Sequence, residues 1–144
     1  MPDRSHPTPP PDNLGLHPAE ESPFKGKTGL RRIWNALGYS LDGLRAAYAC
    51  EDAFRQETRL TALLVPTALL LPLPWLGKGL LIGSLLLVLL VELLNSAVEA
   101  VVDRVSLENH RLAKRAKDIG SAAVLVALLN VLVIWTCTLL EYLA

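Results

Sequence analysis

The sequence predicts an all-α integral membrane protein, with an amphipathic helix at the membrane surface followed by three membrane-spanning helices. Three observations predict this fold class. Apolar residues make up 51% of the 144 residues, a high share for a soluble domain of this size. Three apolar runs are long enough to cross a bilayer. Almost all basic residues precede the first run or lie between the second and the third.

The first 28 residues are predicted to be a disordered tail, and residues 29–144 a single membrane domain. Seven of the ten prolines fall within this tail, together with Ser, Asp and Glu residues. A segment of this composition buries too little apolar surface to fold by itself.

Apolar residues recur at helical spacing over residues 29–57, ahead of the first apolar run. Trp34, Leu37, Leu41 and Leu44 are among them, and arginines lie between them. A basic helix with a tryptophan on its apolar face suits the cytoplasmic surface of a membrane, where anionic head groups attract cations. The alternative is a helix that packs on a soluble partner.

The three predicted spans cover residues 60–76, 79–102 and 119–140. The first has 17 residues, just enough to cross a hydrocarbon core of about 30 Å, while the others have 24 and 22. Pro66, Pro72 and Pro74 interrupt the first span, so its far end is expected to be kinked, unwound or in the interface. The short turn between the first two spans is expected at Lys78.

The distribution of basic residues predicts the orientation of the spans. Eight Lys and Arg residues precede the first span and five lie from Arg104 to Lys117, whereas only Lys78 lies between the first two spans. Basic residues favour the cytoplasmic side. The N-terminus is therefore expected in the cytoplasm and the C-terminus outside it.

Polar residues form a stripe on the second span. The stripe consists of five residues, Glu92, Asn95, Ser96, Glu99 and Asp103. At a helical rotation of about 100° per residue, these five lie within about 100° of arc and so share one face of the helix. Seven residues separate Glu92 from Glu99, which puts Glu99 about 10 Å nearer the cytoplasm. Such a stripe must point into a protein interior or a wet cavity, and it usually marks a functional site.

Three explanations for the stripe remain open at this point. It could hold helices together through hydrogen bonds. It could line the path of an oligomeric ion or proton transporter. It could also belong to an enzyme that acts on a lipid at the cytoplasmic interface, and only this explanation also uses the basic segment that follows the stripe.

The two segments at the cytoplasmic ends of the spans carry groups suited to phosphoryl transfer. Residues 106–118 combine several Lys and Arg residues with Glu108, His110 and Asp118, and residues 50–57 contribute Glu51 among other acids. Cations suit phosphate oxygens, and carboxylates suit Mg²⁺. Phosphoryl transfer requires little more than a metal, cations on the phosphates and a group that orients the attacking hydroxyl.

Three blocks of this sequence resemble the prokaryotic diacylglycerol kinase family of small membrane lipid kinases. These blocks are GLRAAYACEDAFRQE, VELLNSAVEAVVDRVS and RAKDIGSAAVLVALL. The resemblance implies a homotrimer in the bacterial inner membrane, with a cytoplasmic N-terminus and a periplasmic C-terminus. It also implies that ATP and Mg²⁺ are used to phosphorylate diacylglycerol. A related branch phosphorylates undecaprenol, and the blocks look more like the diacylglycerol branch.

The resemblance further implies roles for individual residues. Glu92 is implied as the catalytic base, Glu51 and Glu99 as metal ligands, and Asn95 and Asp103 as supporting residues. ATP contacts are implied for Arg32, Tyr39, Glu51, Glu99, Glu108, His110, Lys117 and Asp118. Lipid contacts are implied for Ser40, Arg45, Ala53, Phe54, Arg55, Gln56, Glu57, Glu92 and Ser121.

Overall fold

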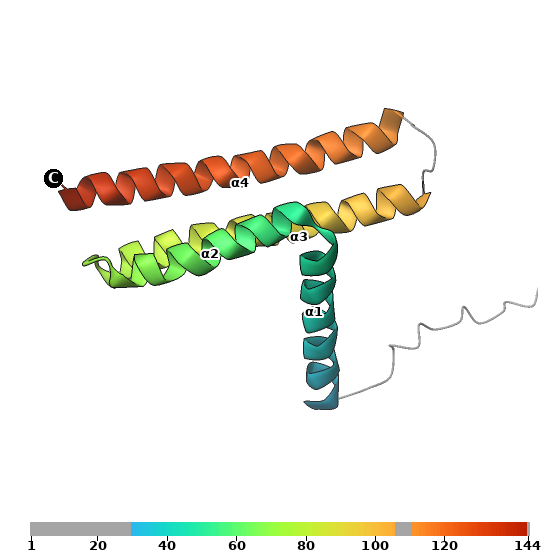
Figure 1. Ribbon diagram of the computed structural model, residues 1–144, viewed down its shortest axis with the longest axis horizontal. Helices are drawn as coiled ribbons and strands as arrows, with labels where there is room; N and C mark the ends of the chain where they lie inside the picture. Colours follow the sequence, from blue (N-terminus) through green and yellow to red (C-terminus); the bar gives the residue numbers. More distant parts are fainter. Residues whose placement is uncertain (1–29, 106–110, 144) are drawn as a thin grey trace, which may run out of the picture. The chain divides into compact units, whose positions relative to one another are not determined.

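A computed structural model describes residues 30–105 and 111–143 as four α-helices, without a β-strand in these ranges (Figure 1). The helices are α1 (Leu30–Cys50), α2 (Asp52–Leu70), α3 (Trp75–Val105) and α4 (Arg111–Leu143). This confirms the predicted all-α fold. The predicted tail, Glu108 and His110 lie outside the described residues.

The chain divides into two compact units at Gly38, within α1. The described part of the first unit, residues 30–38, is helical. The second unit begins at Tyr39 and holds the remainder of α1 together with α2, α3 and α4. All contacts discussed below lie within this second unit.

The single helix expected over residues 29–57 is divided at Glu51. This residue has an extended backbone (φ −109°, ψ 115°), so α1 ends at Cys50 and α2 begins at Asp52. Within α1 the helix continues through Gly43, and Leu41, Leu44 and Tyr48 are exposed. These apolar side chains find little cover in the described chain. Their predicted place at a membrane surface stays a prediction.

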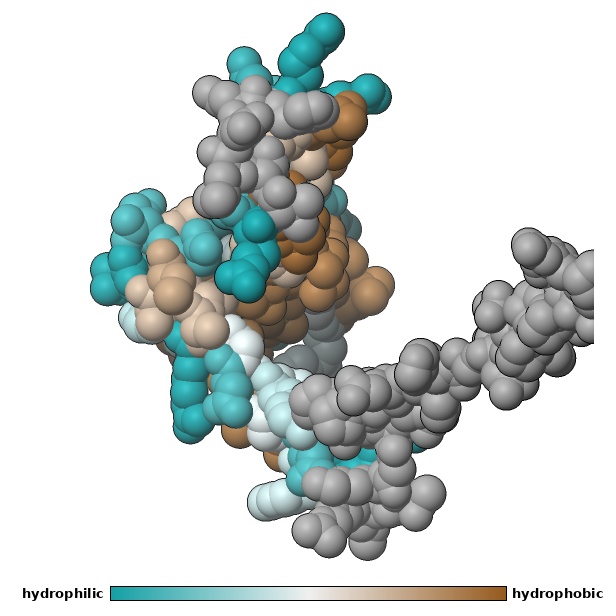
Figure 2. All heavy atoms as spheres, turned by 90° about the vertical axis from the view of Figure 1, so that its right-hand side faces the viewer, coloured by the Kyte–Doolittle hydropathy of each residue, from teal (hydrophilic) through white to brown (hydrophobic). Residues whose placement is uncertain are grey.

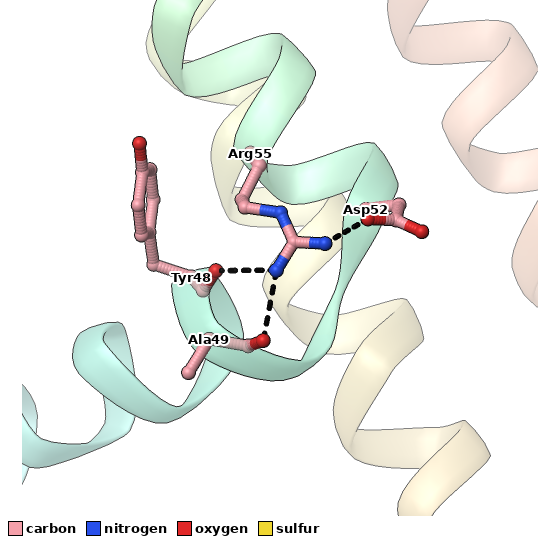
Figure 3. Close-up of polar contacts among 4 residues, drawn as sticks. All are labelled: Tyr48, Ala49, Asp52 and Arg55. Atoms are coloured by element: carbon pink, nitrogen blue, oxygen red, sulfur yellow. Dashed lines mark hydrogen bonds and ion pairs between the residues drawn. The ribbon is translucent and has the colours of Figure 1, made fainter.

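Arg55 fastens the junction between α1 and α2 (Figure 3). Its Nη1 atom donates to the carbonyl oxygens of Tyr48, at 3.3 Å, and Ala49, at 2.8 Å, and its Nη2 atom pairs with Asp52. The last carbonyls of a helix have no partner within the helix itself. The guanidinium therefore satisfies the end of α1 from the first turns of α2.

The connection between α2 and α3 lies at residues 71–74, and this corrects the expected turn at Lys78. A proline disfavours helical backbone at the residue before it, and Leu71, which precedes Pro72, is extended (φ −61°, ψ 139°). Helix α3 then begins at Trp75, so Lys78 lies in its first turn. The Lys78 Nζ atom donates to the Leu69 carbonyl oxygen at 2.6 Å, which closes the end of α2.

Two described helices, α3 and α4, are long and apolar enough to cross a membrane. Helix α2 continues through Pro66, but its charge-free part runs only from Leu60 to Leu70 and rises about 17 Å. That is shorter than a hydrocarbon core of about 30 Å. The predicted span over 60–76 is therefore divided between α2 and α3, and a third crossing stays a prediction.

Helix α3 packs against both α2 and α4, and it carries most of the buried residues of this unit. These residues recur three and four positions apart along one side, at Leu81, Ser84, Leu85, Val88, Glu92 and Ser96. Phe54 and Ala68 of α2 and Ala127 of α4 are buried as well. Helix α4 runs beside α3 in the opposite direction (Figure 1). The polar residues of α3 therefore continue the face that its apolar residues bury.

The end of this unit where α3 ends and α4 begins is rich in hydrophilic residues, which project in Figure 2 while hydrophobic residues lie along the sides of the helices. Arg104, Arg111, Lys114 and Arg115 are exposed there. At the opposite end, Trp75 is exposed and the Lys78 ammonium lies 5.2 Å from its ring centre. The first end thus has several exposed cations, whereas Lys78 is the cation described at the second.

We expect Arg55→Ala to lower the free energy of unfolding by about 1.5–3 kcal/mol, the range for hydrogen bonds made by a charged group. The substitution leaves two carbonyls at the end of α1 without their donor. Chemical unfolding in detergent micelles measures the effect. Arg59→Ala is the matched control, because Arg59 is an exposed arginine on the same helix. Equal stability of the two variants would show that the junction does not depend on this guanidinium.

Candidate active site

Glu92 is a buried carboxylate in the middle of α3, with 4% of its surface exposed. It lies at the interface with α2, where its charge interacts with that of Glu57. A carboxylate is rarely buried this completely, and such groups are concentrated at functional sites. Among the described acidic residues implied for the site, Glu92 is the one that is buried.

Glu57 of α2 interacts with Glu92, and both Glu57 and the neighbouring Thr58 contribute buried polar atoms. Burial and the Glu92 carboxylate raise the pKa of Glu57 to about 7 from an ordinary value of 4.5. The Oε2 atom of Glu57 and the hydroxyl of Thr58 are buried without a hydrogen-bond partner among the described residues. Buried polar atoms normally have partners, so these two are open to a donor or acceptor from a ligand or from another chain. No pattern in the sequence pointed to Thr58.

Members of the polar stripe meet different neighbouring helices. Asn95 lies against α4, in a groove that Ile119, Gly120 and Ala123 also line. Ser96 lies on the other side, toward α1. An arc of about 100° is wide enough to meet two neighbouring helices. Glu92 and Glu99 fall between these two directions on the helix.

Two members of the stripe are in contact with each other. The Asn95 Nδ2 atom donates to the Glu99 Oε1 atom at 3.4 Å, one helical turn away. The Oδ1 atom of Asn95 is buried without a partner among the described residues. Asn95 therefore links the α4 side of α3 to Glu99.

A cavity of about 670 Å³ lies between the second half of α1 and the C-terminal half of α3. Small residues dominate its lining, which consists of Ser40, Gly43, Leu44, Ala46, Ala47, Cys50, Glu51, Leu93, Ser96, Ala97 and Ala100. Only three of these side chains bear an oxygen, and the Ser96 hydroxyl is buried without a partner in the described chain. The cavity combines apolar space with a few polar groups, as ligand pockets generally do.

An ion pair joins α3 to α4 at the hydrophilic end of the unit. The Lys117 Nζ atom lies 2.6 Å from the Asp103 Oδ1 atom, and Lys117 also interacts electrostatically with Glu99 and Glu51. Glu99 and Glu51 also act on the charge of Glu92. The structure therefore brings Glu51, Glu92, Glu99 and Lys117 into one charged region.

Several other residues implied for ligand contacts are not placed in this charged region. Tyr39 and Arg45 are exposed on α1, where Arg45 pairs with Asp42 at 3.2 Å. Arg32 belongs to the first unit of the chain, so the structure does not place it at this site. On α2 and α4, exposed positions are occupied by Ala53, Gln56, Asp118 and Ser121. Phe54 is buried, and Arg55 is engaged at the helix junction.

The donor set at Glu51 and Glu99 fits Mg²⁺ shared with a nucleotide better than a site closed by protein ligands alone. Both carboxylates are half-buried and act on the same neighbouring charges. The described residues contain no group of three or more His, Cys, Asp or Glu side chains that could hold a metal by themselves. Mg²⁺ commonly takes one or two carboxylates and completes its shell with water and phosphate oxygens.

Gly120 is a second residue that the sequence analysis did not single out. Glycine inside a helix is less favourable than alanine, so an interior glycine usually has a packing reason. That signal was readable in the block RAKDIGSAAV, although the partner of Gly120 was not.

We expect the free energy of unfolding to fall as the pH rises from about 4.5 to about 7, because the folded protein keeps a proton on Glu57 that the unfolded chain has released. Glu57→Gln should remove this part of the pH dependence. Unfolding in micelles across this pH range measures it, with Glu141→Gln, an exposed glutamate of α4, as the control. A Glu57→Gln variant that keeps the full slope would contradict the raised pKa.

Comparisons with known proteins identify the family of this chain. The family model of prokaryotic diacylglycerol kinase matches residues 38–139. A diacylglycerol kinase of Pseudomonas aeruginosa is 57% identical over 119 residues, which cover 83% of this chain and 97% of that protein. Diacylglycerol kinases of Escherichia coli and Haemophilus influenzae are 52% and 48% identical, over 78% and 75% of this chain and 92% of each relative. The chain therefore belongs to the prokaryotic diacylglycerol kinase family.

Proposed function

We propose that this protein is an ATP-dependent diacylglycerol kinase, which converts diacylglycerol to phosphatidate and so returns it to phospholipid synthesis. The observation that carries the proposal is the buried Glu92 carboxylate, on the same face of α3 as Glu99, in a chain of this family. The relatives from three bacterial genera are all named diacylglycerol kinase, which favours diacylglycerol over undecaprenol as the lipid.

Glu92 acts as the general base in this proposal. The free hydroxyl of diacylglycerol attacks the γ-phosphorus of ATP, its proton passes to the Glu92 carboxylate, and ADP leaves as the bond to its β-phosphate oxygen breaks. A positioned base of this kind typically contributes 10²–10⁴-fold to a rate. The burial of Glu92 supports the assignment, because it keeps water away from the proposed base.

Glu51 and Glu99 are proposed to hold Mg²⁺. When bound, the ion neutralises charge on the ATP phosphates. Glu99 lies seven residues after Glu92 on the same helix, about 10 Å further along the axis. That separation supports a deeper site for the lipid hydroxyl and a shallower one for the nucleotide.

The remaining contacts are proposed from the resemblance of the sequence to the family. Lys117 and Asp118, at the start of α4, are proposed to contact ATP together with Arg32, Tyr39, Glu108 and His110. The lipid is proposed to occupy the cavity that Ser40 and Ser96 line. Further lipid contacts are proposed for Arg45, Ala53, Phe54, Arg55, Gln56, Glu57 and Ser121.

The protein is proposed to sit in the bacterial inner membrane with a cytoplasmic N-terminus and a periplasmic C-terminus. The exposed cations where α3 ends and α4 begins support a cytoplasmic position for that end. Trp75 and Lys78 at the other end suit the outer interface. We further propose a third span through α2 and the start of α3.

A homotrimer is the proposed assembly. One chain covers its apolar side chains poorly, and Leu86 and Leu90 of α3 remain exposed. The indole nitrogen of Trp135 and the hydroxyl of Ser96 are buried without partners among the described residues. Neighbouring copies could supply both the cover and the missing partners.

Phosphate transfer from labelled ATP to diacylglycerol and to undecaprenol, compared in mixed micelles with Mg²⁺, tests the function. We expect diacylglycerol to be labelled at least about tenfold faster, a difference of about 1.4 kcal/mol in activation free energy. Labelling of neither lipid by folded protein would refute the kinase proposal. Equal or faster labelling of undecaprenol would refute the choice of lipid.

We expect Glu92→Gln to lower kcat by at least about 10²-fold while the KM for ATP changes little, because the amide cannot accept the proton. Steady-state kinetics with diacylglycerol measure both constants. Glu141→Gln, at the far end of α4, serves as the control and should keep wild-type rates. Wild-type turnover by Glu92→Gln would exclude Glu92 as the base.

A further inference from the structure

Gly120 of α4 leaves room for the side chain of Asn95 on α3. A Cβ atom added at Gly120 would overlap the Asn95 Oδ1 atom and would lie 3.2 Å from its Cγ atom. By contrast, a Cβ atom at Gly79 or Gly83 of α3 would meet nothing within 4 Å. The absence of a side chain therefore matters at Gly120 in a way that it does not at these other helical glycines.

The orientation of the Asn95 amide follows from hydrogen-bond chemistry. Only the nitrogen of an amide can donate a hydrogen bond to a carboxylate oxygen, so the amide nitrogen of Asn95 faces Glu99. Its Nδ2 atom donates to Glu99 Oε1 at 3.4 Å, which turns the Oδ1 atom toward Gly120. This oxygen is buried and has no partner in the described chain. The Asn95 Oδ1 atom thus fits against α4 because Gly120 has no side chain, and not because it accepts a hydrogen bond there.

We propose that Gly120 is a positioning residue for the reaction, which acts by giving the Asn95 amide the space it needs to hold the Glu99 carboxylate. This proposal rests on the proposed function, in which Glu99 is a ligand of Mg²⁺. A side chain at position 120 would either turn the Asn95 amide away from Glu99 or push α4 away from α3. Groups that orient a metal ligand typically change metal affinity 10–100-fold when they are lost.

The sequence itself supports a special role for this position. Glycine weakens the interior of a helix relative to alanine. Gly120 lies in the tenth position of the 33-residue helix α4, well inside its ends. The groove around it is otherwise lined by apolar side chains of both helices, including Leu94, Val98 and Ile119. A side chain at position 120 would meet the Asn95 amide in this groove, which is a physical reason for glycine at this position.

The first measurement is the Mg²⁺ requirement of the kinase reaction. Gly120→Ala should raise the Mg²⁺ concentration for half-maximal activity by about tenfold or more. Glu99→Gln is the positive control, and Gly83→Ala, which introduces the same methyl group at an open position of α3, should leave the requirement unchanged. A Gly120→Ala variant with the wild-type Mg²⁺ requirement would overturn the proposal.

The second measurement needs neither Mg²⁺ nor ATP, so it stands even if the protein fails as a kinase. Unfolding is compared for Gly120→Ala and Gly83→Ala, each made in the wild-type chain and in the Asn95→Ala chain. In the wild-type chain, Gly120→Ala should shift the folding equilibrium toward the unfolded state by about tenfold. In the Asn95→Ala chain the same substitution should shift it by less than about twofold, because the Asn95 amide that clashes with the new methyl group is absent. Gly83→Ala should behave alike in both chains.

The double-mutant comparison decides the matter even if Gly120→Ala prevents folding. Recovery of folding in the Gly120→Ala, Asn95→Ala double variant would support the steric link between the two residues. Equal losses in both chains, or failure to fold in both, would overturn it, since the cost would then come from another contact of α4.

Discussion

A carboxylate on a helix that crosses a membrane has to be shielded from lipid, and the arrangement around α3 depends on this constraint. Glu92 is 4% exposed, and its cover comes from helices packed on either side of α3. The same face continues as Leu81, Leu85 and Val88, so apolar contacts hold the helices together where no charge is present. Burial of apolar side chains in the first half of α3 thus stabilises the helix packing that shields the polar side chains of its second half.

The two ends of the second unit are closed by different means. At the hydrophilic end, charged side chains join the helices, as the Lys117–Asp103 ion pair and the Arg55 contacts with the α1 carbonyls illustrate. At the other end, prolines end α2 at Leu70, and Lys78 covers the Leu69 carbonyl that this leaves without a partner. Among the described residues, most of the cations therefore lie at the end where a phosphorylated nucleotide is proposed to bind.

Small residues shape the site as much as charged ones do. Alanine, glycine and serine predominate around the cavity between α1 and α3, which gives it its volume. On the opposite side of α3, Gly120 admits the Asn95 amide. Polar groups on α3 thus have room on both flanks, and the Asn95 side chain reaches Glu99 from one of them. Larger residues on either side of α3 would remove this space even if every charged residue were kept.

Hydropathy and length were sufficient to predict α3 and α4, because a long apolar segment must pair its backbone polar groups within itself. They did not predict where the first helices divide. The break at Glu51 is accompanied by the Arg55 contacts with Tyr48 and Ala49, which no periodicity reveals. The turn at residues 71–74 was readable from the backbone restriction before Pro72 and Pro74, but the single cation at Lys78 drew the prediction away from it.

By itself the sequence determined which face of α3 is polar and how far apart Glu92 and Glu99 lie along it, because both follow from the fixed geometry of a helix. Only the tertiary structure decided which neighbour each polar residue meets. It placed Glu57 beside Glu92, Gly120 beside Asn95 and the α1 cavity beside Ser96. The reason is physical: helical periodicity specifies directions around one axis, whereas the helix found in each direction depends on packing between segments far apart in the chain.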